Sequence, residues 1–139
     1  MHFLHEINFL AVFVAAVVAF LLGAVWYSPL LFAKQWMQVH GYTPEKLKAM
    51  QAQTKRAYAV SFLSLLVLAG ALAILVAITH MTAAIAGIKL GVLCWFGFAA
   101  TIGLMANIYS DKPLKAFLLD AGYQLVYFVV MGGILAAWH

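Results

Sequence analysis

The chain alternates four long apolar runs with shorter polar connections. The runs occupy residues 7–27, 57–79, 83–108 and 116–138. At about 1.5 Å per residue, a helix over each run is long enough to cross the ~30 Å hydrocarbon core of a bilayer. The pattern predicts an all-α, polytopic membrane protein with one membrane domain, 1–139, whose four transmembrane helices form two hairpins.

Small residues recur at helical spacing along three of the runs. They are Ala11, Ala15, Ala19 and Gly23 in the first run, Ala69, Ala73 and Ala77 in the second, and Gly87 and Gly91 in the third. Residues four apart share one helical face, and small side chains there let a second helix approach closely. We expect packing seams at these faces. Because one thin bundle does not need so many, we also expect a homo-oligomer.

The connection over residues 29–56 has an amphipathic pattern. Pro29 disfavours helical geometry at Ser28 and has no N–H to donate, so the first helix should break there. Ser28 is suited to cap a short interfacial helix that starts at Pro29 and stops at Gly41. A further helix is predicted from Pro44, continuing into the second span.

Aromatic residues surround the turn between the first run and this connection. Those in and around the interfacial turn are Trp26, Tyr27, Trp36 and Tyr42, and the turn itself contains Ser28 and Pro29. Trp and Tyr are typical of the boundary between membrane and water. The pattern therefore predicts that this turn lies at the membrane surface.

Composition and charge extend this interpretation. Hydrophobic residues make up 67% of the chain and charged residues 9%, whereas soluble domains have about 25% charged residues. Seven of the eight Lys and Arg lie in the connections 29–56 and 109–115, and Lys89 is the exception. By the positive-inside rule both connections face the cytoplasm and both termini lie outside. The cations favour a role in topology, with anionic lipid headgroups as the alternative, over nucleic acid.

The last run carries its polar residues on one helical face. These are Asp120, Tyr123, Gln124 and Tyr127, at positions i, i+3, i+4 and i+7. A carboxylate inside a span costs about 3 kcal/mol on insertion scales, so this face should turn toward protein or water. Two interpretations stay open: a hydrogen-bond clamp to the second and third spans, or a path for a proton, ion or solute. Candidate partners are Ser61, Ser64, Asn107 and Arg56.

A second polar group is predicted on the outer side. Lys89 is expected to have Glu6 and Asn8 as neighbours, and it either extends its amine to the interface or forms an anion site. The same side carries His2, His5, His80 and His139. Their spacing matches no known metal site, so interfacial histidines are favoured over metal ligands. We expect no metal, no cofactor and no catalytic residues, since no phosphate-binding loop or serine–histidine pairing is present.

Two motifs carry a resemblance. They are Gly23-x-x-Trp26-Tyr27-Ser28-Pro29-x-x-Phe32-x-x-x-Trp36, with Gly41 after it, and Asp120-x-Gly122-Tyr123 in the last run. In these residues the chain resembles a bacterial family of small four-helix membrane proteins catalogued as a domain of unknown function. Ala33 stands where that family usually has glycine. The resemblance covers nearly the whole chain and implies the bacterial inner membrane and a common fold, with no activity attached.

The hypothesis favoured by the sequence is a homo-oligomeric channel or transporter-like protein for a small solute or ion. It rests on the polar face of the last span. The alternative is a non-transporting accessory or scaffold protein that binds a partner or anionic lipid. An enzyme would need a second polar cluster near Asp120, which the sequence does not offer.

Overall fold

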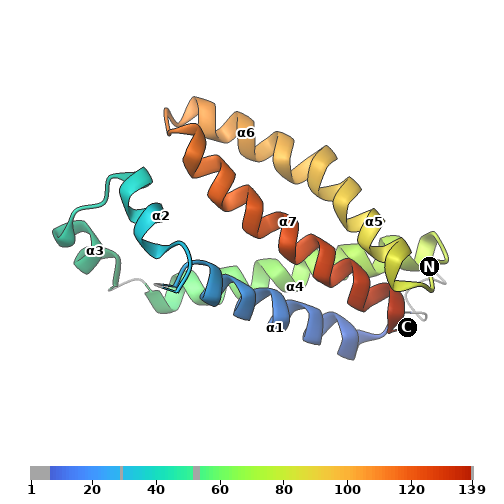
Figure 1. Ribbon diagram of the computed structural model, residues 1–139. Coiled ribbons are helices and arrows are strands. Elements are labelled where there is room, and N and C mark those ends of the chain that lie inside the picture. Colours follow the sequence, from blue (N-terminus) through green and yellow to red (C-terminus); the bar gives the residue numbers. More distant parts are fainter. Residues whose placement is uncertain (1–6, 29, 52–53, 139) are drawn as a thin grey trace.

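The computed structural model describes residues 7–28, 30–51 and 54–138, and over these residues it is all-α. Three of its long helices are α1 (Phe9–Trp26), α4 (Thr54–Ile78) and α7 (Leu114–Ala137) (Figure 1). A further long helix, the third span, consists of α5 (Ala84–Cys94), the π-helical segment η2 (Trp95–Ala99) and α6 (Ala100–Tyr109). All four are long and apolar enough to cross a membrane. The predicted fold class is confirmed.

Helix α7 lies at the centre of the bundle (Figure 1). It contacts α1, α4 and α5, and a larger share of it is buried than of the other spans. The fully buried side chains around it include Ala11, Ala15 and Ala19 of α1, Ala69 of α4, and Met131 of α7 itself. The small-residue seams predicted in the first two spans therefore form the core, because alanine lets the three helix axes come close.

The third span packs on α7 through glycine. A Cβ added to Gly87 would overlap the carbonyl oxygen of Gly132 and lie 2.6 Å from the Cβ of Ala136. Gly91 meets the backbone of Phe128 in the same way. The seam predicted at Gly87 and Gly91 is thus a backbone-to-backbone contact, which only glycine permits here.

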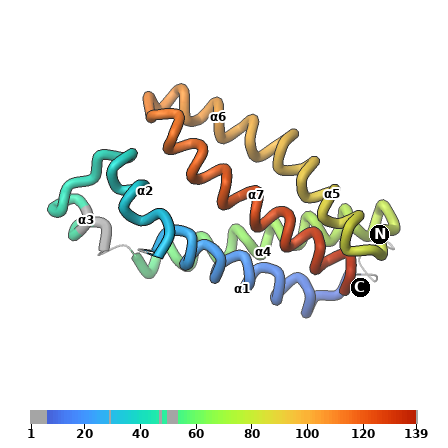
Figure 2. Tube along the Cα trace, viewed as in Figure 1, coloured from blue at the N-terminus to red at the C-terminus, as the bar shows by residue number. Residues whose placement is uncertain are grey.

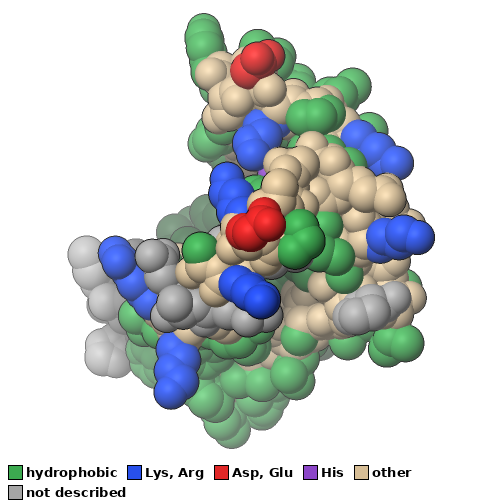
Figure 3. Space-filling model, turned by 90° about the vertical axis from the view of Figure 1, so that its left-hand side faces the viewer, with side chains coloured by type: hydrophobic (Ala, Val, Ile, Leu, Met, Phe, Trp, Pro, Cys, Tyr) green, Lys and Arg blue, Asp and Glu red, His purple; other side chains and the backbone are tan. Residues whose placement is uncertain are grey.

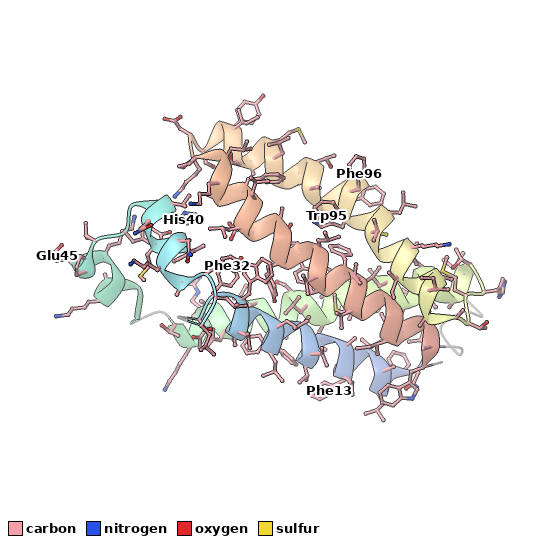
Figure 4. All side chains as sticks on the ribbon, viewed as in Figure 1. Phe13, Phe32, His40, Glu45, Trp95 and Phe96 are labelled. Carbon is pink, nitrogen blue, oxygen red and sulfur yellow. The ribbon has the colours of Figure 1, made fainter. Side chains whose placement is uncertain are left out.

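Many large apolar side chains on the outside of the bundle are exposed. Phe96, Phe98 and Ile102 on the third span are each more than 60% exposed, and Phe96 points away from α7 (Figure 4). In a span such surface faces acyl chains or another copy of the protein.

The interfacial connection differs from its prediction at one point. The short helix α2 (Ala33–His40) begins at Ala33 and not at Pro29, which itself lies outside the described residues. The Ser28 hydroxyl donates to the carbonyl oxygen of Val25 (2.6 Å) and accepts from the N–H of Leu30 (3.2 Å). Ser28 therefore closes a turn at the end of α1, and the helix starts only after that turn.

The rest of this connection follows the sequence pattern. Gly41 ends α2 with φ 67°, a left-handed conformation that suits glycine. The Thr43 hydroxyl accepts from the N–H of Lys46 (3.2 Å) and caps α3 (Pro44–Gln51). Whether α3 continues into α4 depends on residues 52–53, which lie outside the described residues.

Cations collect at one end of the bundle. Figure 2 shows α2, α3 and the turn between α6 and α7 at this end of the bundle. The start of α1 and the end of α7 lie at the opposite end. Figure 3 looks onto the first of these, which we call the basic end, and shows Lys and Arg spread over it. Lys89, on α5, lies toward the other end, so the charge segregation seen in the sequence is also a spatial one.

Candidate functional site

The end of α1 docks onto α7 around Asp120. The indole Nε1 of Trp26 donates to the carbonyl oxygen of Leu119 (3.0 Å), and the hydroxyl of Tyr27 donates to Oδ1 of Asp120 (2.7 Å). A Cβ added to Gly122 would lie 3.0 Å from Cζ2 of Trp26, so glycine lets the indole lie close against α7. The two motifs noted in the sequence are therefore in direct contact.

A third bond ties α1 to α7 further into the bundle. The hydroxyl of Tyr123 donates to the carbonyl oxygen of Ala19 (2.7 Å). Gly23 makes room for it, since a Cβ there would lie 2.6 Å from the tyrosine oxygen. Because α1 and α7 hold each other on both sides of Asp120, this carboxylate has a fixed position.

The third span contributes one donor to the same region. Nε1 of Trp95 donates to the carbonyl oxygen of Ala121 (2.9 Å), and Figure 4 places Trp95 between η2 and α7. The π-helical turn begins at this residue, and such turns change the direction in which side chains leave a helix. The carbonyls of Leu119 and Ala121, on either side of Asp120, thus each accept an indole N–H.

Helix α2 covers the site at the basic end. The Trp36 ring lies edge-on to Tyr27 (centroids 6.1 Å apart) and packs on His40 (4.7 Å). Nδ1 of His40 lies 3.2 Å from Nζ of Lys112, which follows α6. An ammonium group can only donate, so Nδ1 accepts and the neutral imidazole carries its proton on Nε2.

That second nitrogen is unsatisfied. Nε2 of His40 is buried and has no hydrogen-bond partner within the described ranges. Burial, followed by the charge of Lys112, lowers the pKa of His40 below its usual value, although Asp120 opposes this shift. Burial, and then the bond to Asp120, raise the pKa of the Tyr27 phenol. The phenol therefore stays protonated and acts as a donor. His40 is therefore a neutral imidazole whose Nε2–H is unpaired.

These groups line one cavity of about 350 Å³, which we call the Asp120 cavity. Its lining residues are Tyr27, Trp36, His40 and Asp120. It combines a carboxyl acceptor, an unsatisfied N–H and aromatic rings. Such a set can hold a small molecule that carries a cationic group for the carboxylate and the rings, and an acceptor for the imidazole.

A larger cavity of about 560 Å³, which we call the hydroxyl cavity, lies between α1, α4 and α7. Its polar lining consists of Tyr27, Tyr58, Ser61, Ser64, Tyr123 and Tyr127. Tyr27 lines both cavities. The lining of the hydroxyl cavity contains no charged side chain among the described residues.

The structure divides the polar face predicted on the last span. Asp120 lines one cavity and Tyr123 and Tyr127 the other, while Gln124 lines neither. The partner of Asp120 is Tyr27, from the interfacial turn.

The four residues considered as partners lie elsewhere. Ser61 and Ser64 line the hydroxyl cavity, and Arg56 is exposed near the start of α4. The side-chain N–H of Asn107 donates to the carbonyl oxygen of Pro113 (3.1 Å) and so holds the turn before α7. These partners were predicted only because they should lie at the same depth in the membrane as Asp120. The turn at Ser28 places Tyr27 next to Asp120 instead.

Sequence reasoning did not single out His40, Trp95 or Lys112. His40 lies four residues after Trp36, on the same face of α2, and that spacing was the available signal for it. Neither the π-helical turn at Trp95 nor the approach of Lys112 to His40 has a local sequence signature.

The predicted outer group is only partly described. Glu6, His2, His5 and His139 lie outside the described residues. Asn8 caps α1, its side-chain oxygen accepting from the N–H of Ala11 (3.1 Å), and Lys89 is exposed. Over the ranges that the structure covers, no group of three or more His, Cys, Asp or Glu is placed to hold a metal.

Comparison with known proteins gives one match. A family model described as "Protein of unknown function (DUF1761)" matches residues 10–136, which include both motifs around Asp120. No curated protein and no solved structure matches the chain.

Proposed function

Because the chain belongs to the DUF1761 family of proteins of unknown function, its activity has to be inferred from its own geometry, and we propose a transporter-like role. In this proposal the Asp120 cavity binds a small organic cation that also carries a hydrogen-bond acceptor. The basic end faces the cytoplasm of a bacterial cell, by the positive-inside rule. The observation that carries the proposal is that Asp120 and His40 line the same cavity, and that Nε2 of His40 has no hydrogen-bond partner among the described residues.

The position of Asp120 supports a functional role for the carboxylate. It belongs to a span, where a charged group is costly and is usually retained for binding or transport. Tyr27 occupies Oδ1, and a carboxylate can accept several further bonds. Aromatic rings such as those of Tyr27 and Trp36 add attraction for a cation.

The core supports a carrier rather than an open pore. Ala15, Ala69 and Met131 have no exposed surface, so the bundle is filled between the Asp120 cavity and the opposite end. There, a separate cavity of about 260 Å³ includes Asn8 and His80 in its lining. Two cavities with a packed barrier between them suit alternating access, with the binding site now on the basic side.

We further propose that copies of the chain associate. Most of the side-chain surface is exposed at three residues of the third span: Phe96, Phe98 and Ile102. In this part of the span, η2 and α6 pack mainly on α7 among the other long helices. A second copy would cover this face, and a C2 dimer is the commonest way of doing so.

A specific observation also favours the scaffold alternative. Trp26, Trp95 and Tyr123 all use their polar hydrogens on backbone carbonyls of neighbouring helices. Such bonds clamp the bundle, and in that case Asp120 only anchors Tyr27. The cations of the basic end would then bind anionic lipid or a partner.

Direct binding separates these functions. We would titrate the purified protein with choline, glycine betaine and tetramethylammonium by calorimetry, since the first two carry an acceptor atom and the third does not. Asp120→Asn should weaken choline binding about tenfold to hundredfold, because the quaternary ammonium loses the opposite charge of the carboxylate. Asp111→Asn, on the exposed turn before α7, is the matched control and should change nothing. If none of the three probes binds, the scaffold function is favoured.

His40 gives a second, finer test. His40→Ala should weaken choline and glycine betaine more than tetramethylammonium, because only the first two offer an acceptor to Nε2. An equal loss for all three probes would show that the imidazole does not contact the solute.

A further inference from the structure

The hydroxyl cavity has features that the proposed transport function does not use. Four of its hydroxyl groups, those of Tyr58, Ser61, Ser64 and Tyr127, make no hydrogen bond within the described part of the chain. The threonine hydroxyls of the spans are paired: Thr79 donates to the carbonyl oxygen of Leu75 (2.6 Å) and Thr101 to that of Gly97 (3.0 Å). Tyr109, at the exposed end of the third span, makes no hydrogen bond among the described residues. The unpaired groups are thus concentrated around one cavity.

Unpaired hydroxyls are costly in this location. Ser61 and Ser64 lie four and seven residues after the start of the second apolar run at Ala57, or about 6–10 Å along the helix at ~1.5 Å per residue. That depth lies inside the hydrocarbon region, where little water is available to satisfy them. A ligand with acceptor oxygens would remove this cost.

The cavity opens toward the membrane. Tyr58 and Val60 of α4 are 60% and 55% exposed, and Ser61 and Ser64 are exposed too. Exposed surface of a span that no second copy covers faces lipid, so a ligand can reach the cavity sideways from the leaflet at the basic end. This direction of access favours an amphiphile over a water-soluble molecule.

The lining also restricts the chemistry of the ligand. No charged side chain borders the cavity in the part of the chain described, so an ion would lose hydration with no opposite charge to offset the loss. Aromatic rings form much of the wall: Phe20 lies edge-on to Tyr58 (5.9 Å), and Tyr123 to Tyr127 (4.9 Å). Flat rings in such arrangements suit a further flat ring.

We propose that the hydroxyl cavity binds a lipid of the quinone class: an uncharged, planar ring with carbonyl acceptors and an apolar tail. The Tyr127 and serine hydroxyls donate to the ring carbonyls, and the tail leaves between α1 and α4 into the leaflet. The site involves binding only. It does not rest on the proposed transport function, because it uses neither Asp120 nor His40.

The test uses the full-length protein in phosphatidylcholine nanodiscs, titrated with decylubiquinone and followed by quenching of intrinsic fluorescence. Tyr127→Phe removes one donor and keeps the ring, so it should weaken binding about threefold to tenfold, as expected for one hydrogen bond. Tyr109→Phe, at a tyrosine that is 90% exposed and outside the cavity, is the matched control and should bind as the wild type does. Ser64→Leu should abolish binding by filling the cavity.

Three results would overturn the proposal. One is the absence of saturable binding to the unmutated protein. Another is equal affinity of the Tyr127→Phe and Tyr109→Phe variants. The third is equal displacement of the quinone by dioctanoylglycerol, which has ester carbonyls but no ring and would make the cavity a general lipid site.

Discussion

Removal of the Tyr27 hydroxyl tests the contact on which the site depends. In Tyr27→Phe the 2.7 Å bond to Oδ1 of Asp120 is lost and the ring is kept. A hydrogen bond to a charged group contributes about 1.5–3 kcal/mol to stability. Because both side chains are only half-buried, we expect the lower end of that range, a loss of about 1.5 kcal/mol in the free energy of unfolding.

The assay is reversible unfolding by sodium dodecyl sulfate in mixed micelles, followed by tryptophan fluorescence. Tyr109→Phe, at an exposed tyrosine, should leave the unfolding free energy unchanged. A double-mutant cycle with Asp120→Ala isolates the bond, and we expect a coupling of about 1 kcal/mol or more. Additivity of the two single changes within about 0.5 kcal/mol would refute the direct contact between Tyr27 and Asp120.

Three further outcomes follow from the packing and the charges. Gly132→Ala should destabilise the protein by about 1–3 kcal/mol, because the added methyl group meets the backbone of α5, whereas Gly97→Ala, with open space around it, should be neutral or stabilising in the same unfolding assay. Trp95→Phe should cost about 1 kcal/mol through loss of its bond to Ala121, and an unchanged unfolding curve would contradict that bond. The lowered pKa of His40 means that the undocked state binds more protons than the docked one, so docking of α2 should be complete above about pH 6.5 and weaken as the pH falls below it. Protonation of His40 would remove the acceptor for Lys112 and place two cations together, although Asp120 partly offsets the lowering of the pKa. The fluorescence of Trp36 should therefore change with pH in this range. In the His40→Gln variant it should not change.

The helices and their seams could be predicted because their signals are local. The spacing of Ala11, Ala15 and Ala19, and of Gly87 and Gly91, defines a face within one helix, and helix packing in membranes uses such faces. The stop at Gly41 is local in the same sense. Features that depend on the residues of a single helix could therefore be predicted from the sequence.

The site could be predicted only in part. Asp120 could be identified because a carboxylate inside a span is energetically costly. Its partner, Tyr27, depends on how α1 ends. There the Ser28 hydroxyl donates to the carbonyl oxygen of Val25 and does not cap a helix that starts at Pro29. His40 reaches the cavity because α2 folds back over α7, a tertiary arrangement with no pattern in the sequence. The orientation across the membrane and the association of copies stay predictions.

Flux measured across proteoliposomes tests the central claim most directly. Vesicles containing the unmutated protein should take up radiolabelled choline faster than empty vesicles. Asp111→Asn should keep this uptake, and Asp120→Asn should reduce it at least tenfold. Uptake through the Asp120→Asn protein at the unmutated rate, or no uptake above that of empty vesicles, would contradict the account.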